Sequence, residues 1–97
     1  MIIIYGGNNV REDARAEVEA AAAAFVAASL AEEGCIEYNL SWEMNKPASV
    51  RLVEAWDTAE AHKAHTEQEH TKTWAALMRS VALEAPTFHR YSGEPVA

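Results

Sequence analysis

The chain has 97 residues, of which 49% are hydrophobic and 24% charged, the composition of a single globular domain over residues 1–97. Fifteen acidic residues against eight Lys and Arg give a formal net charge of −7, so nucleic acid and anionic membrane surfaces are not expected partners. The opening apolar run is too short for a signal peptide, and no run reaches the roughly 20 residues that span a bilayer. The single cysteine, Cys35, cannot form an internal disulfide, which favours a cytoplasmic protein.

The first third of the chain predicts a strand and a long helix. Residues 2–5 are β-branched and aromatic and predict a short strand, which the Gly-Gly-Asn-Asn sequence at 6–9 is expected to end. Residues 11–33 contain no Gly or Pro and are rich in Ala, Glu and Arg, so they predict a helix. Asn9 is in place to cap the start of this helix, and Gly34 to end it.

The middle of the chain predicts a β-hairpin. Residues 35–44 alternate in polarity and are rich in Ile, Tyr, Leu and Trp, which indicates a second strand. Residues 45–48 include Pro47 and predict a turn, after which residues 50–56 form the third strand.

The last third predicts a helix in two pieces and a final strand. Residues 57–60 form a capping box that opens a helix to about residue 66, and a second segment follows over 69–84. Pro86 ends this segment, and residues 87–91 predict the fourth strand.

The order βαββαβ predicts a ferredoxin-like α+β fold with a four-stranded antiparallel sheet. Both faces of the predicted strands carry apolar side chains, for example Leu52 on one face and Val53 on the other. The helices can cover only one face, and the other would be an apolar patch too large for a monomer to leave in water. We therefore expect a homodimer in which a second copy covers the sheet, a dimeric α+β barrel.

Two histidines are the first candidates for chemistry. Imidazole side chains can act as general bases near neutral pH, so either His65 or His70 could serve in this role. His70 precedes Trp74 by four residues and shares a helical face with it. The alternative is that both histidines are hydrogen-bonded residues at helix ends. Trp56, at the end of the third strand, is either a core side chain or the wall of a pocket for a flat aromatic ligand.

Polar side chains on the strands supply further candidates. Tyr38 and Asn39 point to opposite faces of their strand, and whichever faces the helices could donate a hydrogen bond to a phenolate or quinone oxygen. Glu54 could be a base if it is buried, or an ion-pair partner of Arg51 or Arg90 if it is not.

No metal site and no cofactor are expected. His62 and His65 have a workable helical spacing for ligands, with Glu69 and His70 nearby, but spacing alone is weak evidence and a third ligand would have to come from across the helix break. There is no Gly-rich phosphate loop, nucleophile elbow or flavin fingerprint.

Several of these motifs resemble those of the antibiotic biosynthesis monooxygenase (ABM) family. They are the Gly-Cys-x-x-Tyr sequence from Gly34, the Glu-x-Trp strand end at Trp56, and the following helix with Ala-His and His70. The resemblance extends over nearly the whole chain in length and element order. It implies a dimeric α+β barrel that oxidises an electron-rich phenol, quinol or anthrone with dioxygen, without flavin or metal.

The resemblance also implies roles for the candidate residues. His65 or His70 would act as the base, Asn39 or Tyr38 would donate a hydrogen bond, and aromatic side chains would stack on the substrate. The residues expected to bind substrate are Tyr38, Trp56, Trp74 and Glu54.

Two other functions are compatible with this resemblance. Haem-degrading members carry an Asn on the first strand, a Trp at the end of the third, and a His on the following helix as the iron ligand. Trp56 fits, but Gly6 and Gly7 occupy the first-strand position, with Asn8 and Asn9 displaced into the turn. The position of the ligand His falls near Trp74 or Ala75. The second alternative is a non-catalytic barrel that binds a small ligand, since fold does not fix function.

Overall fold

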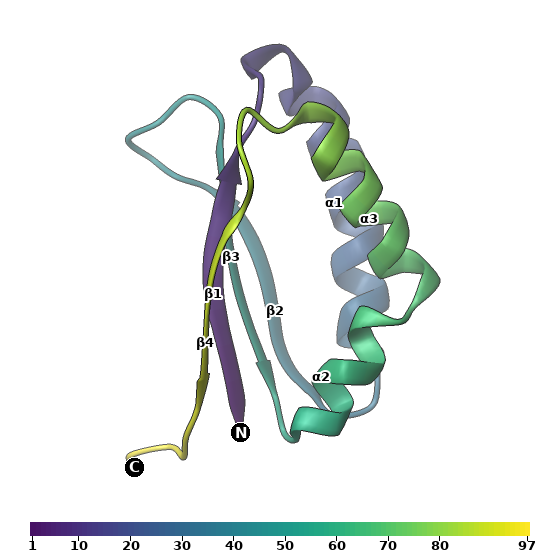
Figure 1. The fold of residues 1–97 in the computed structure, drawn as a ribbon, viewed down its shortest axis with the longest axis vertical. Helices are drawn as coiled ribbons and strands as arrows, with labels where there is room; N and C mark the ends of the chain where they lie inside the picture. Colours follow the sequence, from purple (N-terminus) through teal and green to yellow (C-terminus); the bar gives the residue numbers. More distant parts are fainter.

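A four-stranded antiparallel sheet forms one layer of the molecule, and the helices form a second layer against one of its faces (Figure 1). The structure is a computed structural model that describes all 97 residues. Its elements are β1 (Ile2–Asn9), the short 3₁₀ helix η1 (Glu12–Ala14), α1 (Arg15–Leu30), β2 (Cys35–Trp42), β3 (Ser49–Trp56), α2 (Ala59–Thr66), α3 (Glu69–Val81) and β4 (Thr87–Ser92). This order confirms the predicted ferredoxin-like α+β fold, including the break in the second helix.

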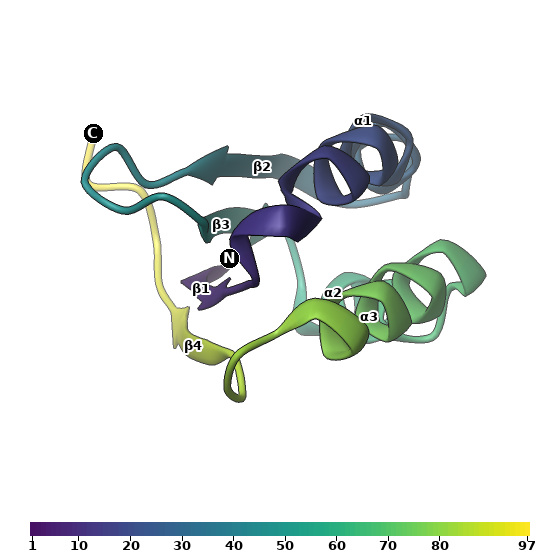
Figure 2. The same ribbon diagram turned by 90° about the horizontal axis from the view of Figure 1, so that it is seen from above.

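The strand order across the sheet is β2-β3-β1-β4, and every neighbouring pair is antiparallel. Seen from above, α1 and α3 lie side by side over one face of the sheet, whereas no element covers the other face (Figure 2). Side chains on β1 alternate accordingly: Ile2 and Ile4 are buried, whereas Ile3 and Tyr5 are exposed.

The first strand is longer than predicted, because the glycines do not end it. β1 continues through Gly6 and Gly7 to Asn9, which pairs with Ser49 on β3. A β-carbon at Gly6 would collide with the carbonyl of Thr87, and one at Gly7 with the carbonyl of Val50. Glycine here permits close approach of three backbones instead of forming a turn.

The first helix is shorter than predicted at both ends. Asn9 does not cap it, because Asn9 belongs to the strand; η1 precedes α1, and no side chain caps either element. α1 ends at Leu30, which is exposed, and Gly34 lies in the turn beyond it with a left-handed backbone (φ 82°). A β-carbon at Gly34 would meet the Asp57 carboxylate, so glycine allows this turn to pack against the start of α2.

The hairpin and the two-part helix form as predicted, although β2 ends at Trp42 instead of residue 44 and α3 ends at Val81 instead of residue 84. A bulge between Cys35 and Glu37 disturbs the start of β2 and leaves Ile36 exposed, although strict alternation would bury it beside Tyr38. Thr58 is the N-cap of α2, and its side chain accepts a hydrogen bond from the Ala61 N–H.

Two clusters of buried side chains fill the space between sheet and helices. The first contains Ile2, Ile4, Phe25, Tyr38, Leu52 and Trp56, and the second contains Val10, Ala14, Val18, Ala48, Val50 and Val81. Trp74 packs against both clusters. None of the helices has the length and apolar character required to cross a bilayer.

Candidate functional site

The candidate residues converge at one end of the sheet, where Trp56 is paired with both Ile2 on β1 and Cys35 on β2. The turn after α1 and the short helix α2 meet at this end (Figure 1). Six of the seven side chains selected from the sequence lie together between the sheet and the helices: Tyr38, Glu54, Trp56, His65, His70 and Trp74.

Asn39 is the seventh, and the structure does not bring it to this cluster. Its side chain is exposed on the opposite face of the sheet, where Asn39 pairs with Val53. Tyr38 is the neighbour that faces the helices, and it is buried. Of the two donors left open by the sequence, only Tyr38 is therefore in reach of the histidines.

His65 is the centre of the cluster. It is only 3% exposed, and its ring lies 4.8 Å from the ring of Trp56, 5.2 Å from that of Tyr38 and 6.1 Å from that of Phe25. α2 places His65 on its inner side, since Thr58 fixes where the helix begins. An imidazole enclosed by aromatic rings is shielded from water, which strengthens its polar interactions.

One carboxylate holds both candidate histidines. Glu32 Oε2 lies 2.7 Å from Nδ1 of His65 and 2.7 Å from Nε2 of His70. A carboxylate can only accept, so each of these nitrogens carries the hydrogen. The Glu32 side chain is 11% exposed, so both hydrogen bonds are largely protected from water. Thr71 Oγ1 lies 3.3 Å from the same nitrogen of His65.

These hydrogen bonds fix the tautomer of each imidazole. In its neutral form, with the hydrogen on Nδ1, His65 has its lone pair on Nε2, and neutral His70 has it on Nδ1. A carboxylate that orients an imidazole and stabilises its cation is the arrangement found in acid–base dyads of enzymes. The geometry can therefore support proton abstraction by His65, with Glu32 as its positioning residue.

A second carboxyl group, Glu54, is buried beside the first site. Its Oε1 accepts a hydrogen bond of 2.8 Å from Trp56 Nε1 and lies 3.6 Å from Nε2 of His62. Burial raises the pKa of Glu54, although the Trp56 hydrogen bond and nearby His65 oppose the rise. Burial lowers the pKa of His62, so its pair with Glu54 is not a strong ion pair at neutral pH.

Tyr38 is held as a neutral phenol. Burial raises its pKa, and the nearby Glu54 carboxyl group adds to the rise. The hydroxyl therefore keeps its proton throughout the neutral range, and it lies within hydrogen-bonding reach of the Glu54 carboxyl group.

Phe25 and Trp74 close the cluster on the side of the helices. Their rings stack with centroids 4.9 Å apart and an angle of 3° between planes. Phe25 also lies 6.0 Å from the ring of His70 and meets Tyr38 edge to face. Aromatic side chains thus fill the space beside the two histidines.

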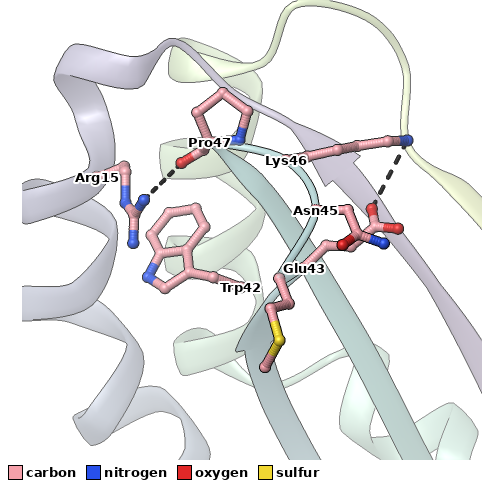
Figure 3. A pocket seen from close by; sticks show the side chains of 7 residues that line it. Arg15, Trp42, Glu43, Asn45, Lys46 and Pro47 are labelled. Carbon is pink, nitrogen blue, oxygen red and sulfur yellow. Dashed lines mark hydrogen bonds and ion pairs between the residues drawn. The ribbon is translucent and has the colours of Figure 1, made fainter.

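Two hollows of the surface lie elsewhere. One of about 400 Å³ lies beside the β2–β3 hairpin, where Arg15 stacks on Trp42 at 4.4 Å and donates to the Pro47 carbonyl (Figure 3). A smaller one, of about 280 Å³, has no hydrophobic lining and lies along Gly6–Asn9 between Arg51 and His89. Neither contains a residue of the histidine cluster.

Sequence reasoning missed Glu32 and gave His62 only a place in a metal motif. Glu32 lies in the turn after α1, 33 and 38 residues before the two histidines, and no local pattern marks it. Only the left-handed turn at Gly34, which packs against α2, brings these segments together.

The haem alternative gains no support from the first strand. Asn8 is buried in β1, not displaced into a turn as expected, and its Nδ2 donates to the Glu84 carbonyl. It pairs with Val50, six residues along β3 from Trp56, a separation of roughly 20 Å. Asn8 and Trp56 therefore lie near opposite ends of the sheet.

Comparison with known proteins gives one family. The sequence model of the family described as antibiotic biosynthesis monooxygenase matches residues 1–77. No curated protein matches the chain in sequence.

Solved structures share the complete fold. A protein from Nitrosomonas europaea, named after the antibiotic biosynthesis monooxygenases, is 22% identical, with a TM-score of 0.89 over 96% of this chain and 98% of the other. One from Deinococcus radiodurans, named in the same way, is 19% identical, with a TM-score of 0.89 over 100% and 97%. A conserved protein from Methanosarcina mazei Go1 is 22% identical, with a TM-score of 0.89 over 96% and 92%. At these identities the likeness shows the fold alone.

Proposed function

This chain belongs to the antibiotic biosynthesis monooxygenase family, and we propose that it is a monooxygenase that oxidises an electron-rich aromatic small molecule with dioxygen, without a bound cofactor. The substrate class is a phenol, quinol or anthrone. The free thiol of Cys35 suits work in the cytoplasm.

The observation that carries this proposal is the 2.7 Å contact between Glu32 and His65 within a cluster of aromatic rings. A buried imidazole with a fixed tautomer is suited to remove a weakly acidic proton, since Glu32 stabilises the imidazolium that forms. Trp56 and Trp74 would supply flat apolar walls, and the Tyr38 hydroxyl would turn from the Glu54 carboxyl group to donate to the developing oxyanion.

The reaction needs no electrons beyond those of the substrate. His65 removes a proton from the ring CH₂ of an anthrone, and the resulting carbanion adds dioxygen to form a peroxide. The imidazolium of His65 returns its proton to the distal peroxide oxygen. Loss of water then leaves a carbonyl, so one oxygen atom enters the product and the other leaves as water. The protein contributes a base, an oxyanion donor and a site that excludes water.

Substrate binding requires the Phe25–Trp74 stack to open. Trp74 is only partly buried, and it lies on α3, so movement of its ring toward solvent would admit a flat molecule next to His65. The substrate would replace one aromatic contact by another, which keeps the free-energy cost small.

The proposed enzyme is a homodimer that joins two copies through the open face of the sheet. This face presents Ile3, Tyr5, Val53 and Tyr91, each between 37% and 54% exposed. Tyr5 stacks on His89 and on Tyr91, so β1 and β4 present a continuous aromatic surface on this face. Arg51 lies on the same face and has no ion-pair partner in its own chain. An exposed apolar sheet face of this kind is commonly covered by a second copy of the chain.

Oxygen uptake tests the proposal. Chelator-treated protein is mixed with a panel of anthrones and hydroquinones, and dioxygen, hydrogen peroxide and product are measured together. The proposal predicts one dioxygen consumed per anthrone converted, no free peroxide and no dependence on added flavin or metal. Tight binding of a panel member without any uptake would instead support a non-catalytic ligand-binding barrel.

A further inference from the structure

We propose that Glu32, His65 and His70 together bind one divalent transition-metal ion, such as Zn²⁺ or Co²⁺, and that this ion competes with the hydrogen bonds that hold the two imidazoles. Metal binding goes beyond the proposed oxygenase and does not depend on it.

The donor set and its positions support such a site. One carboxylate oxygen and two imidazole nitrogens lie within 4.8 Å of one another, and they come from three separate segments. Zn²⁺ binds nitrogen and oxygen at about 2.0–2.2 Å, which places neighbouring ligand atoms about 3.3 Å apart. The two 2.7 Å contacts of Glu32 would lengthen by about 0.6 Å, a movement within the reach of side-chain rotation.

The chemistry of the three residues also suits a metal. Two neutral imidazoles and one carboxylate form a site of charge −1, which a divalent ion converts to +1 inside a chain of net charge −7. On binding, each imidazole moves its hydrogen to its other nitrogen, so neither histidine needs to be charged. Thr71 Oγ1, 3.3 Å from His65 Nδ1, is positioned to hydrogen-bond a water on the ion.

The other two histidines and the single cysteine of the chain are not part of this donor set. His62 faces Glu54, with Nε2 at 3.6 Å from its carboxylate. Cys35 directs its Sγ toward the Glu37 carbonyl at 3.7 Å, and burial raises the pKa of its thiol. His89 stacks on Tyr5 on the far face of the sheet. These residues therefore serve as matched controls.

Binding would have a consequence for the proposed function, and this consequence alone rests on it. A metal on Nδ1 of His65 places the hydrogen on Nε2 and removes the lone pair that would act as the base. The metal-loaded protein would then lose oxygenase activity and regain it with a chelator.

Titration of untagged protein with Co²⁺ tests the site directly, with absorption in the visible region as readout and Zn²⁺ competition to confirm it. The expected result is one Co²⁺ per chain, displaced by Zn²⁺. Glu32→Gln, His65→Gln and His70→Gln should each weaken binding at least about 10-fold. His89→Gln and Cys35→Ser should bind as the wild type does.

Absence of stoichiometric binding in the wild-type protein would overturn the proposal, as would full binding by all three triad variants. Should a triad variant fail to fold, imidazole ¹⁵N NMR of the wild-type protein decides the matter. Zn²⁺ should shift the signals of His65 and His70; a shift confined to His62 or His89 would place the ion elsewhere.

Discussion

Glu32 Oε2 lies 2.7 Å from Nδ1 of His65, although the two residues are 33 positions apart in the chain. The contact joins the turn after α1 to the short helix α2 beneath the end of the sheet. It fixes which nitrogen of His65 carries the hydrogen, and thereby leaves the other free. The proposed chemistry depends on this relationship more than on any other.

Glu32→Gln should lower kcat on the order of 10²-fold with little change in KM, because the amide cannot stabilise an imidazolium and does not contact substrate. Imidazole ¹⁵N NMR should show the Nδ1–H tautomer of His65 in the wild-type protein and a mixture in the variant. Glu33→Gln, at the exposed neighbouring position, is the matched control. An unchanged tautomer together with unchanged kcat would assign Glu32 a purely structural role.

Trp56→Phe should destabilise the fold by about 2–3 kcal/mol, because Trp56 is fully buried and its Nε1 is the donor to Glu54 Oε1. Trp42→Phe removes a similar indole hydrogen bond, to the exposed Glu19 carboxylate, and should cost less than about 1 kcal/mol. Urea denaturation of the two variants provides the comparison. If both variants lose the same free energy of unfolding, the buried Trp56–Glu54 hydrogen bond stabilises the fold no more than the exposed Trp42–Glu19 one.

Glu54→Gln should stabilise the protein at neutral pH and lose this advantage in acid. Burial raises the pKa of Glu54, so the folded protein holds the proton more tightly than the unfolded chain. As pH rises above the ordinary carboxyl pKa of about 4.3, ionisation of the buried side chain increasingly lowers the free energy of unfolding. Above the raised pKa of the folded state, this loss of stability no longer changes with pH. Glutamine keeps an acceptor for Trp56 Nε1 without the charge.

The relevant measurement is the difference in free energy of unfolding between Glu54→Gln and wild type from pH 4 to 8. The difference should grow in favour of the variant as pH rises. A constant difference, or one that grows toward acid pH, would contradict the assigned burial effect.

Val53→Glu should convert a dimer into a monomer, because Val53 is 41% exposed at the centre of the open sheet face. A pair of carboxylates facing each other in the apolar interface would be strongly unfavourable. Size-exclusion chromatography with light scattering measures the mass, and Lys72→Glu, exposed on α3, is the control. Wild-type protein that elutes as a monomer would exclude the dimer.

The sequence predicts most of the fold because its local signals agree with the tertiary structure. Thr58 and its neighbours open α2 where expected, and the alternation of Val50, Leu52 and Trp56 fixes the buried face of β3. The errors arise where tertiary contacts override local propensity. Gly6 and Gly7 resemble a turn in sequence, yet they extend β1 because neighbouring carbonyls approach too closely for a β-carbon.

The site was predictable only in part, for a related reason. His65, His70 and Trp74 lie on successive helical segments, and their spacing indicates a shared neighbourhood. Glu32 comes from a turn whose path depends on the left-handed backbone of Gly34, and periodicity carries no information about such a path. The choice between Tyr38 and Asn39 likewise needed the register of β2 against β3.

Whether His65 is the base is decided by oxygen uptake of chelator-treated wild type and His65→Gln, on the anthrone that the wild-type protein oxidises fastest. Lys63→Gln, exposed on the same helix, controls for changes to α2. His65→Gln should lose at least about 10²-fold in kcat while its thermal unfolding remains cooperative. A folded His65→Gln that consumes oxygen at the wild-type rate would contradict this role of His65.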